Sequence, residues 1–234
     1  MRFQDASRDG RAIVYAGIQA DPLVARVASL LAGATTAERW LARAAMNGER
    51  TEADVWRHIF PSLFGKNAAA ELRTRAEEIL EASLAVANRG EAARSSYRGA
   101  VVEELTARLL AAREERGPAG GGTATSAPVR RERRVLFDGV RAEIHPYDVT
   151  VESSARPEVY DCKWGGRGIN ADVLDQLDEA RSNAADEEID LRVAIVVFDA
   201  RRTCEIRLDR SNANRAGTLL VGLEDLDDLR EPHA

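Results

Sequence analysis

Two short segments decide the fold: YDVTV at residues 147–151 and EVYDCKW at residues 158–164. In both, β-branched or apolar residues alternate with polar ones, a period of two that is typical of β-strands with one face toward a core. Residues 153–156 between them suit a short connecting loop. We therefore expect the two segments to pair as an antiparallel hairpin.

The expected register gathers charged side chains on one face of the hairpin. If Val151 lies opposite Glu158, then Asp148 lies opposite Asp161, with their Cβ atoms about 5 Å apart. Side chains alternate between faces, so Lys163 shares the face of Asp161. Directly opposed like charges destabilise a strand pair, and a divalent cation such as Mg²⁺ would offset that repulsion.

This register has one alternative. Pro157 could shift the pairing by one residue, and such a shift moves Asp148 to the opposite face of the sheet. Glu143 would then be the reserve metal ligand. A second alternative is that Asp161 and Lys163 are ordinary charges on an exposed strand.

The sequence on either side of the hairpin predicts an α/β domain. Strands are expected near residues 134–137, 191–198 (LRVAIVVF) and 204–208, and helices near 94–116 and 171–184. This order of elements predicts a mixed β-sheet flanked by helices.

The first 93 residues show helical periodicity and no strand pattern. Asp21-Pro22 and the capping box Thr35–Glu38 are typical helix starts, and Thr51–Asp54 fits a capping box more loosely. The stretch GPAGGGTATSAP, residues 117–128, predicts a flexible insertion. We expect an all-α N-terminal domain over residues 1–93, serving recognition or assembly, and a catalytic domain over residues 94–234.

The composition excludes several classes of protein. The net charge of −6 argues against a nonspecific coat on nucleic acid, and no apolar run approaches the roughly 18 residues of a membrane span. Cys162 and Cys204 form no CxxC pair, so we expect a reduced, cytoplasmic protein without structural zinc or a disulfide scaffold. Of 33 basic residues only Lys66 and Lys163 are lysines. Chance explains Lys66 as well as function does, but the acidic neighbours of Lys163 favour a function.

These residues resemble the PD-(D/E)XK nuclease superfamily, which has the restriction-endonuclease-like fold. Asp148 followed by Asp161-Cys162-Lys163 is similar to the bipartite motif of that family, although Pro146-Tyr147-Asp148 replaces its adjacent Pro-Asp. Glu103, in the expected helix over residues 94–116, resembles the glutamate of the first helix of the family. Gln176 resembles a glutamine often found on the helix after the motif. The resemblance covers about residues 94–210.

The resemblance implies a metal-dependent endonuclease that hydrolyses phosphodiester bonds. Asp148 and Asp161, the main-chain carbonyl of Cys162 and Glu103 would hold Mg²⁺, for which Mn²⁺ can substitute. Lys163 would orient the attacking water or stabilise the developing negative charge. Gln176 would position Lys163 or a phosphate group.

Nucleic acid is the expected partner, and DNA is favoured over RNA because the superfamily mostly cuts DNA. The basic residues expected at the phosphate backbone are Arg130, Arg131, Arg133, Arg134 and Arg167. A solvated strand edge explains the run of arginines equally well. The family resemblance suggests a setting in restriction, defence or repair.

Two other functions fit the same sequence. The chain could be a catalytically inactive nuclease fold that binds nucleic acid or a protein, although the intact acid-x-lysine argues against it. It could instead be an adaptor that forms a homodimer or binds a protein partner through its N-terminal helices, which its net acidity would suit. Dependence of any activity on a divalent metal separates the nuclease from both.

Overall fold

The structure is a computed structural model that describes residues 1–6, 10–48, 50–116, 126–138, 140–141, 145–210 and 217–231. Most of the insertion expected at residues 117–128 and the reserve ligand Glu143 lie outside the described residues. None of the described helices is both long and apolar enough to span a membrane.

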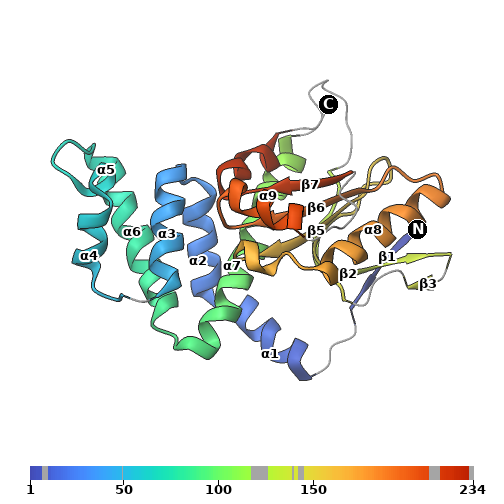
Figure 1. Ribbon diagram of the computed structural model, residues 1–234, viewed down its shortest axis with the longest axis horizontal. Coiled ribbons are helices and arrows are strands. Elements are labelled where there is room, and N and C mark those ends of the chain that lie inside the picture. Colours follow the sequence, from blue (N-terminus) through green and yellow to red (C-terminus); the bar gives the residue numbers. More distant parts are fainter. Residues whose placement is uncertain are drawn as a thin grey trace. The chain divides into compact units, whose positions relative to one another are not determined.

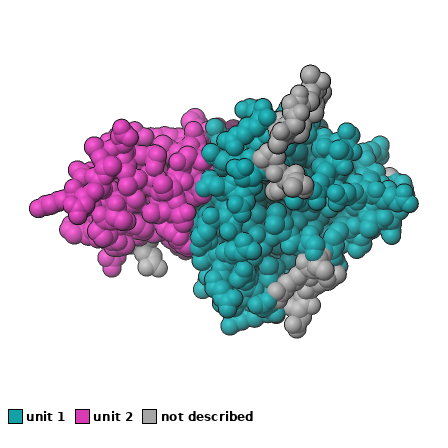
Figure 2. All heavy atoms as spheres, turned by 90° about the horizontal axis from the view of Figure 1, so that it is seen from above, with its two compact units in different colours: residues 1–8, 106–234 teal, residues 9–105 magenta. Residues whose placement is uncertain are grey.

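The chain forms two compact units (Figure 2). We call residues 9–105 the helical unit, and residues 1–8 with 106–234 the sheet unit. The division falls inside one continuous helix, α7 (Glu91–Arg116), whereas the sequence predicted a boundary between residues 93 and 94. The chain therefore passes from one unit to the next without a loop at the boundary.

The sheet unit is built on a mixed β-sheet (Figure 1). Its described strands are β1 (Arg2–Asp5), β2 (Val129–Phe137), β3 (Val140–Arg141), β4 (Tyr147–Val151), β5 (Glu158–Lys163), β6 (Arg192–Val197) and β7 (Thr218–Val221). Their order is β1-β2-β4-β5-β6-β7, and β3 pairs with β2. Neighbours from β1 to β5 are antiparallel, whereas β5, β6 and β7 are parallel. The mixed α/β class expected from the sequence is confirmed.

Helices cover both faces of β5. Val159 packs in an apolar core with Leu174 and Leu177 of α8 (Ala171–Asp186). Cys162, whose side chain points to the opposite face, contacts Thr106 of α7. Four further elements complete the described part of this unit: the second half of α7, α9 (Arg201–Arg210), and the 3-10 helices η1 (Gly166–Gly168) and η2 (Leu223–Arg230).

Ion pairing also ties α7 to β5. The guanidinium of Arg113 donates to Glu158 at 2.8 Å, and both side chains are buried. The phenol of Tyr160 donates to the same carboxylate. A buried ion pair needs such additional hydrogen bonds to offset its desolvation, and this network fixes the helix over the strand that carries Asp161 and Lys163.

The helical unit follows the predicted helix starts with one exception. Its elements are α1 (Gly10–Gln19), α2 (Pro22–Ala32), α3 (Thr36–Asn47), α4 (Ala53–Ile59), α5 (Pro61–Phe64), α6 (Ala70–Ala87) and the first half of α7. Asp21 caps α2, and Thr35 with Glu38 forms the capping box of α3. The looser box at residues 51–54 is wrong, because Glu52 precedes α4 and makes no side-chain cap.

One predicted strand was wrong, and the strands β1, β3 and β7 were not predicted. Residues 204–208 belong to helix α9, in which Cys204 and Leu208 are one turn apart and both buried. In so short a segment, alternating apolar residues fit a strand and one face of a helix equally well. β1 lies in a region predicted to contain no strand, and β7 was not predicted; each has only four residues, too few for a periodic signal.

Candidate active site

The hairpin of β4 and β5 has the predicted register. Val151 pairs with Glu158, and the pairing continues to Val149 opposite Tyr160. The regular pairs end there, one position before Asp148 and Asp161. Asp148, Asp161 and Lys163 thus lie beyond the last regular pair of the hairpin, toward the carboxyl end of β5.

Asp148 is oriented by the main chain of the neighbouring strand. Its Oδ2 accepts a hydrogen bond from the N–H of Cys162 at 2.6 Å. The same oxygen lies 4.0 Å from Nζ of Lys163. The carboxylate is half-buried, so its position is set by β5 rather than by contact with solvent.

Asp161 and Lys163 form a close ion pair on one face of β5, as the alternation predicts. Nζ of Lys163 lies 2.7 Å from Oδ1 and 2.6 Å from Oδ2 of Asp161. Burial raises the pKa of Asp161, and the ammonium of Lys163 opposes that rise. Burial alone would lower the pKa of Lys163, but the carboxylates of Asp148 and Asp161 outweigh it and the pKa of Lys163 is raised. The ammonium is therefore protonated at neutral pH.

Glu103 is buried on α7, one turn before Thr106, where the same helix contacts β5. Both of its carboxylate oxygens accept hydrogen bonds from α1: Oε1 from the phenol of Tyr15, and Oε2 from Nε2 of Gln19 at 2.7 Å. The two donors are one helical turn apart on α1. Each carboxylate oxygen has a second lone pair, which Glu103 could offer to a cation.

Glu132 adopts an unusual backbone conformation in the middle of β2. Its φ is 56°, in the left-handed region that residues other than glycine seldom adopt. Arg131 and Arg133 on either side keep regular pairs with Val149 and Tyr147 of β4. The distortion is therefore confined to Glu132. Local strain of this kind costs about 1–3 kcal/mol and often marks a functional site.

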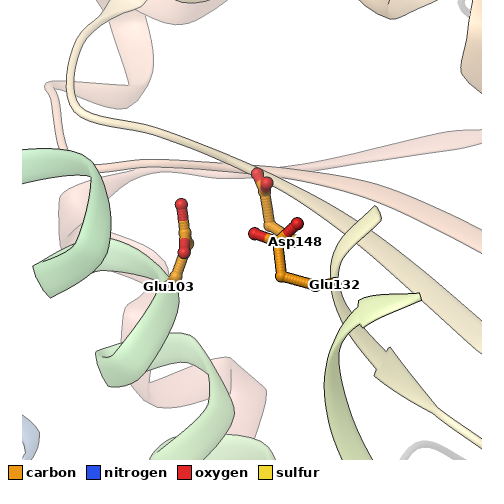
Figure 3. Close-up of side chains that lie close together, drawn as sticks. All are labelled: Glu103, Glu132 and Asp148. Atoms are coloured by element: carbon orange, nitrogen blue, oxygen red, sulfur yellow. The ribbon is translucent and has the colours of Figure 1, made fainter. Parts of the chain in front are cut away.

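The carboxylates of Glu103, Glu132 and Asp148 form an acidic cluster (Figure 3). One ligand oxygen from each lies within 4.8 Å of the others. Glu103 comes from α7, whereas Glu132 and Asp148 come from neighbouring strands. Two of these, Glu103 and Asp148, were expected from the sequence as metal ligands. Asp161, the other expected carboxylate, is paired with Lys163 beside the cluster.

The side chains of Gln176 and Cys162, also expected at the site, form hydrogen bonds with neighbouring elements. Nε2 of Gln176 donates to the main-chain carbonyl of His145 at 3.0 Å, just before β4 begins. The thiol of Cys162 is buried and donates to Oγ1 of Thr106 at 3.5 Å. The hydrogen bond of the Gln176 side chain therefore goes to the segment that leads into β4, the strand of Asp148.

The arginines expected to contact nucleic acid fall into two groups. Arg130 and Arg167 are exposed. Arg133 is half-buried and forms two ion pairs. Its Nε donates to Glu152 at 2.7 Å, and its Nη1 pairs with Asp5. Arg131 and Arg134 are half-buried too. Of the set, Arg130 and Arg167 are thus the most accessible to a phosphate backbone.

Sequence reasoning missed three residues of this site. Glu132 stands as the only acid within the basic run RRERR (residues 130–134), a signal that the sequence analysis did not use. Tyr15 and Gln19 have the i, i+4 spacing of one helix face. Nothing in the sequence connects that face with Glu103, because the two positions are more than eighty residues apart, with separations of 88 and 84.

Comparisons with known proteins assign the chain to no family. No protein-family model matches it, and no sufficiently similar curated protein was found. The chain is similar to the crystal structure of protein VC1899 from Vibrio cholerae, with 17% sequence identity and a TM-score of 0.46. The similarity covers 98% of this chain but 56% of that one, so this chain spans little more than half of that protein. This similarity is too low to support a conclusion about fold or activity.

Proposed function

We propose that the chain is a metal-dependent nuclease that hydrolyses phosphodiester bonds, with DNA as its substrate. One observation carries the proposal: the ammonium of Lys163 lies 2.6 Å from the carboxylate of Asp161 and 4.0 Å from that of Asp148. An ammonium ion beside carboxylates suits phosphodiester hydrolysis, because the carboxylates can hold a metal ion and the ammonium can stabilise the negative charge that develops on the phosphate.

The donor set of the acidic cluster fits Mg²⁺ or Mn²⁺. All three side chains offer carboxylate oxygen, the ligand type that these hard cations prefer. Three carboxylates within 4.8 Å of one another repel when ionised. A divalent cation would remove that repulsion. Glu103, Glu132 and Asp148 are accordingly the proposed ligands, whereas Asp161 pairs with Lys163.

Each residue near the acidic cluster has a distinct role in the proposed hydrolysis. A bound divalent cation would polarise the scissile phosphate and lower the pKa of a bound water. Lys163 places a fixed positive charge where negative charge develops on the phosphate. Asp161 holds that ammonium by its ion pair, and Asp148 is held in turn by the main-chain N–H of Cys162. Arg130 and Arg167, both exposed, are the proposed contacts with the phosphate backbone.

Cleavage assays test this function directly. Supercoiled plasmid, linear duplex DNA, single-stranded DNA and RNA are each incubated with the full chain in Mg²⁺, Mn²⁺ or EDTA. We expect cutting of DNA with either metal and none in EDTA. Absence of cutting, together with absence of metal binding by calorimetry, would leave a module that binds a protein or nucleic acid. Metal binding without cutting would move the search to other substrates.

The strained residue Glu132 provides a separate test of the acidic cluster. Asparagine tolerates a positive φ and carries no charge, so Glu132→Asn relieves both backbone strain and repulsion. In EDTA we expect the free energy of unfolding to rise by about 1 kcal/mol. Wild type gains about 2.7 kcal/mol at a free metal concentration of 100 Kd, and Glu132→Asn should gain much less. Thermal melts with and without Mn²⁺ measure both effects.

Glu132→Gln is the matched control for that experiment. It removes the charge but keeps a side chain that disfavours positive φ. It should lose the metal-dependent gain just as Glu132→Asn does, with a smaller rise of stability in EDTA. A full metal-dependent gain in both variants would exclude Glu132 as a ligand.

A further inference from the structure

The chain turns sharply after Lys163, and the turn packs against that side chain. β5 ends at Lys163, and η1 (Gly166–Gly168) follows after two residues. Hydrogen bonds close the turn: the N–H of Gly168 donates to the carbonyl of Gly165 at 2.8 Å, and that of Ile169 to Gly166 at 3.2 Å. The short turn thus brings Gly168 back beside the side chain of Lys163.

There is no room for a side chain at Gly168. A Cβ atom at this position would lie 2.8 Å from Cδ, 3.0 Å from Cγ and 3.1 Å from Cβ of Lys163. These atoms form the base of the lysine stem, which cannot swing aside as freely as its tip. The φ of Gly168 is outside the left-handed region. The glycine is therefore required for space and not for its backbone conformation.

Contacts on both sides of the turn at residues 165–169 hold its backbone in place. The N–H of Gly166 donates to Oδ2 of Asp199 at 3.0 Å. Ile169 is buried in the core of the sheet unit. Before the turn, the ring of Trp164 packs on Phe198 with their centroids 5.2 Å apart. If a side chain were added at Gly168, the lysine stem would move and the turn would stay.

We propose that Gly168 is a positioning residue that directs the ammonium of Lys163 toward Asp161 and Asp148. The bare Cα surface of Gly168 lets the stem leave β5 along a path that ends 2.6 Å from one carboxylate and 4.0 Å from the other. The role of Lys163 in catalysis rests on the proposed function. The packing of its stem on Gly168 does not.

Gly168→Ala should displace the ammonium without disturbing the acidic cluster. Misplacement of a catalytic group by about 1 Å can cost about 10²-fold in rate. We expect kcat to fall by about that factor, with KM and the affinity for Mn²⁺ unchanged. Gly166→Ala is the matched control in the same turn. The three atoms nearest to its Cβ would belong to Thr203, Arg207 and Asp199, at 3.3–3.7 Å, and not to Lys163, so kcat should stay within a few-fold of wild type.

The chain contains only two lysines, which allows a test that needs no activity. Protein labelled with ¹³C at lysine Cε gives two signals, and Lys66→Arg assigns the one from Lys163. At fixed pH and in EDTA, Gly168→Ala should shift the Lys163 signal, whereas Gly166→Ala should leave it in place. Urea melts of both variants confirm that the chain is folded.

The outcomes separate this inference from the proposed function. An unmoved Lys163 signal in folded Gly168→Ala would overturn the inference, whatever the activity. A moved signal with an inactive wild type would uphold the packing and count against the nuclease. If the wild type cuts, Gly168→Ala should cause no further loss in a Lys163→Ala background, because both act through one side chain. An equal loss in both backgrounds would overturn the inference.

Discussion

Lys163→Ala is expected to reduce cleavage by about 10²–10³-fold while the protein still binds Mg²⁺, because a single positioned charge at a developing oxyanion is worth about that factor. The ammonium lies 4.0 Å from Asp148 and 2.6 Å from Asp161, so its removal takes a positive charge away from the acidic cluster. Metal affinity should therefore stay the same or increase. Single-turnover cleavage and calorimetry with Mg²⁺ separate the two effects.

Two further variants show whether the position of the charge matters. Lys163→Arg keeps the positive charge but replaces a compact ammonium with a planar fork. It should recover little of the lost activity, since Gly168 leaves the stem only a narrow path. Lys66→Ala removes the other lysine of the chain and should cut at the rate of wild type. Normal cleavage by Lys163→Ala would remove this residue from the mechanism.

Asp148→Asn is expected to abolish tight metal binding and to reduce cleavage by about 10³-fold. The amide oxygen can still accept the N–H of Cys162, so the hairpin should keep its geometry. What is lost is the negative charge that the acidic cluster offers to a cation. Charge stabilisation by a catalytic metal is worth several kcal/mol, and about 4 kcal/mol corresponds to roughly a 10³-fold loss of rate. Calorimetry with Mn²⁺ and cleavage assays provide the measurements.

A matched control lies in the helical unit. Asp21 also accepts a main-chain N–H, from Leu23 at 2.8 Å, and a hydrogen bond from the phenol of Tyr97. Asp21→Asn makes the same chemical change outside the acidic cluster. It should lower the stability of α2 slightly and leave Mn²⁺ affinity unchanged. Equal Mn²⁺ affinity in Asp148→Asn and wild type would refute the proposed metal centre.

Local patterns predicted the hairpin that carries the site. A period of two over residues 147–151 and 158–163 was enough to place Val151 opposite Glu158 and to bring Asp161 next to Lys163. The reason is that side-chain alternation is a property of the strand itself. Helix starts such as Asp21 were equally readable, since a cap is formed by residues adjacent in sequence.

Local patterns were insufficient where an element depends on a distant partner. The segment 204–208 alternates like a strand, but burial of Cys204 and Leu208 on one side makes it a helix. The strand β1 is too short to show a periodic pattern in the sequence. Its pairing with β2, in which Phe3 lies opposite Val135, makes it a strand. In both cases the decisive interactions come from other parts of the chain.

The sequence by itself determined the acid-x-lysine strand, its pairing register and the mixed α/β class, because each follows from the periodicity of adjacent residues. The tertiary structure alone decided which carboxylates meet. Glu132 lies beside Asp148 because β2 pairs with β4, and Tyr15 and Gln19 of α1 donate hydrogen bonds to Glu103. Strand pairing and long-range hydrogen bonds between distant segments leave no periodic mark on a sequence, since they arise when those segments pack together.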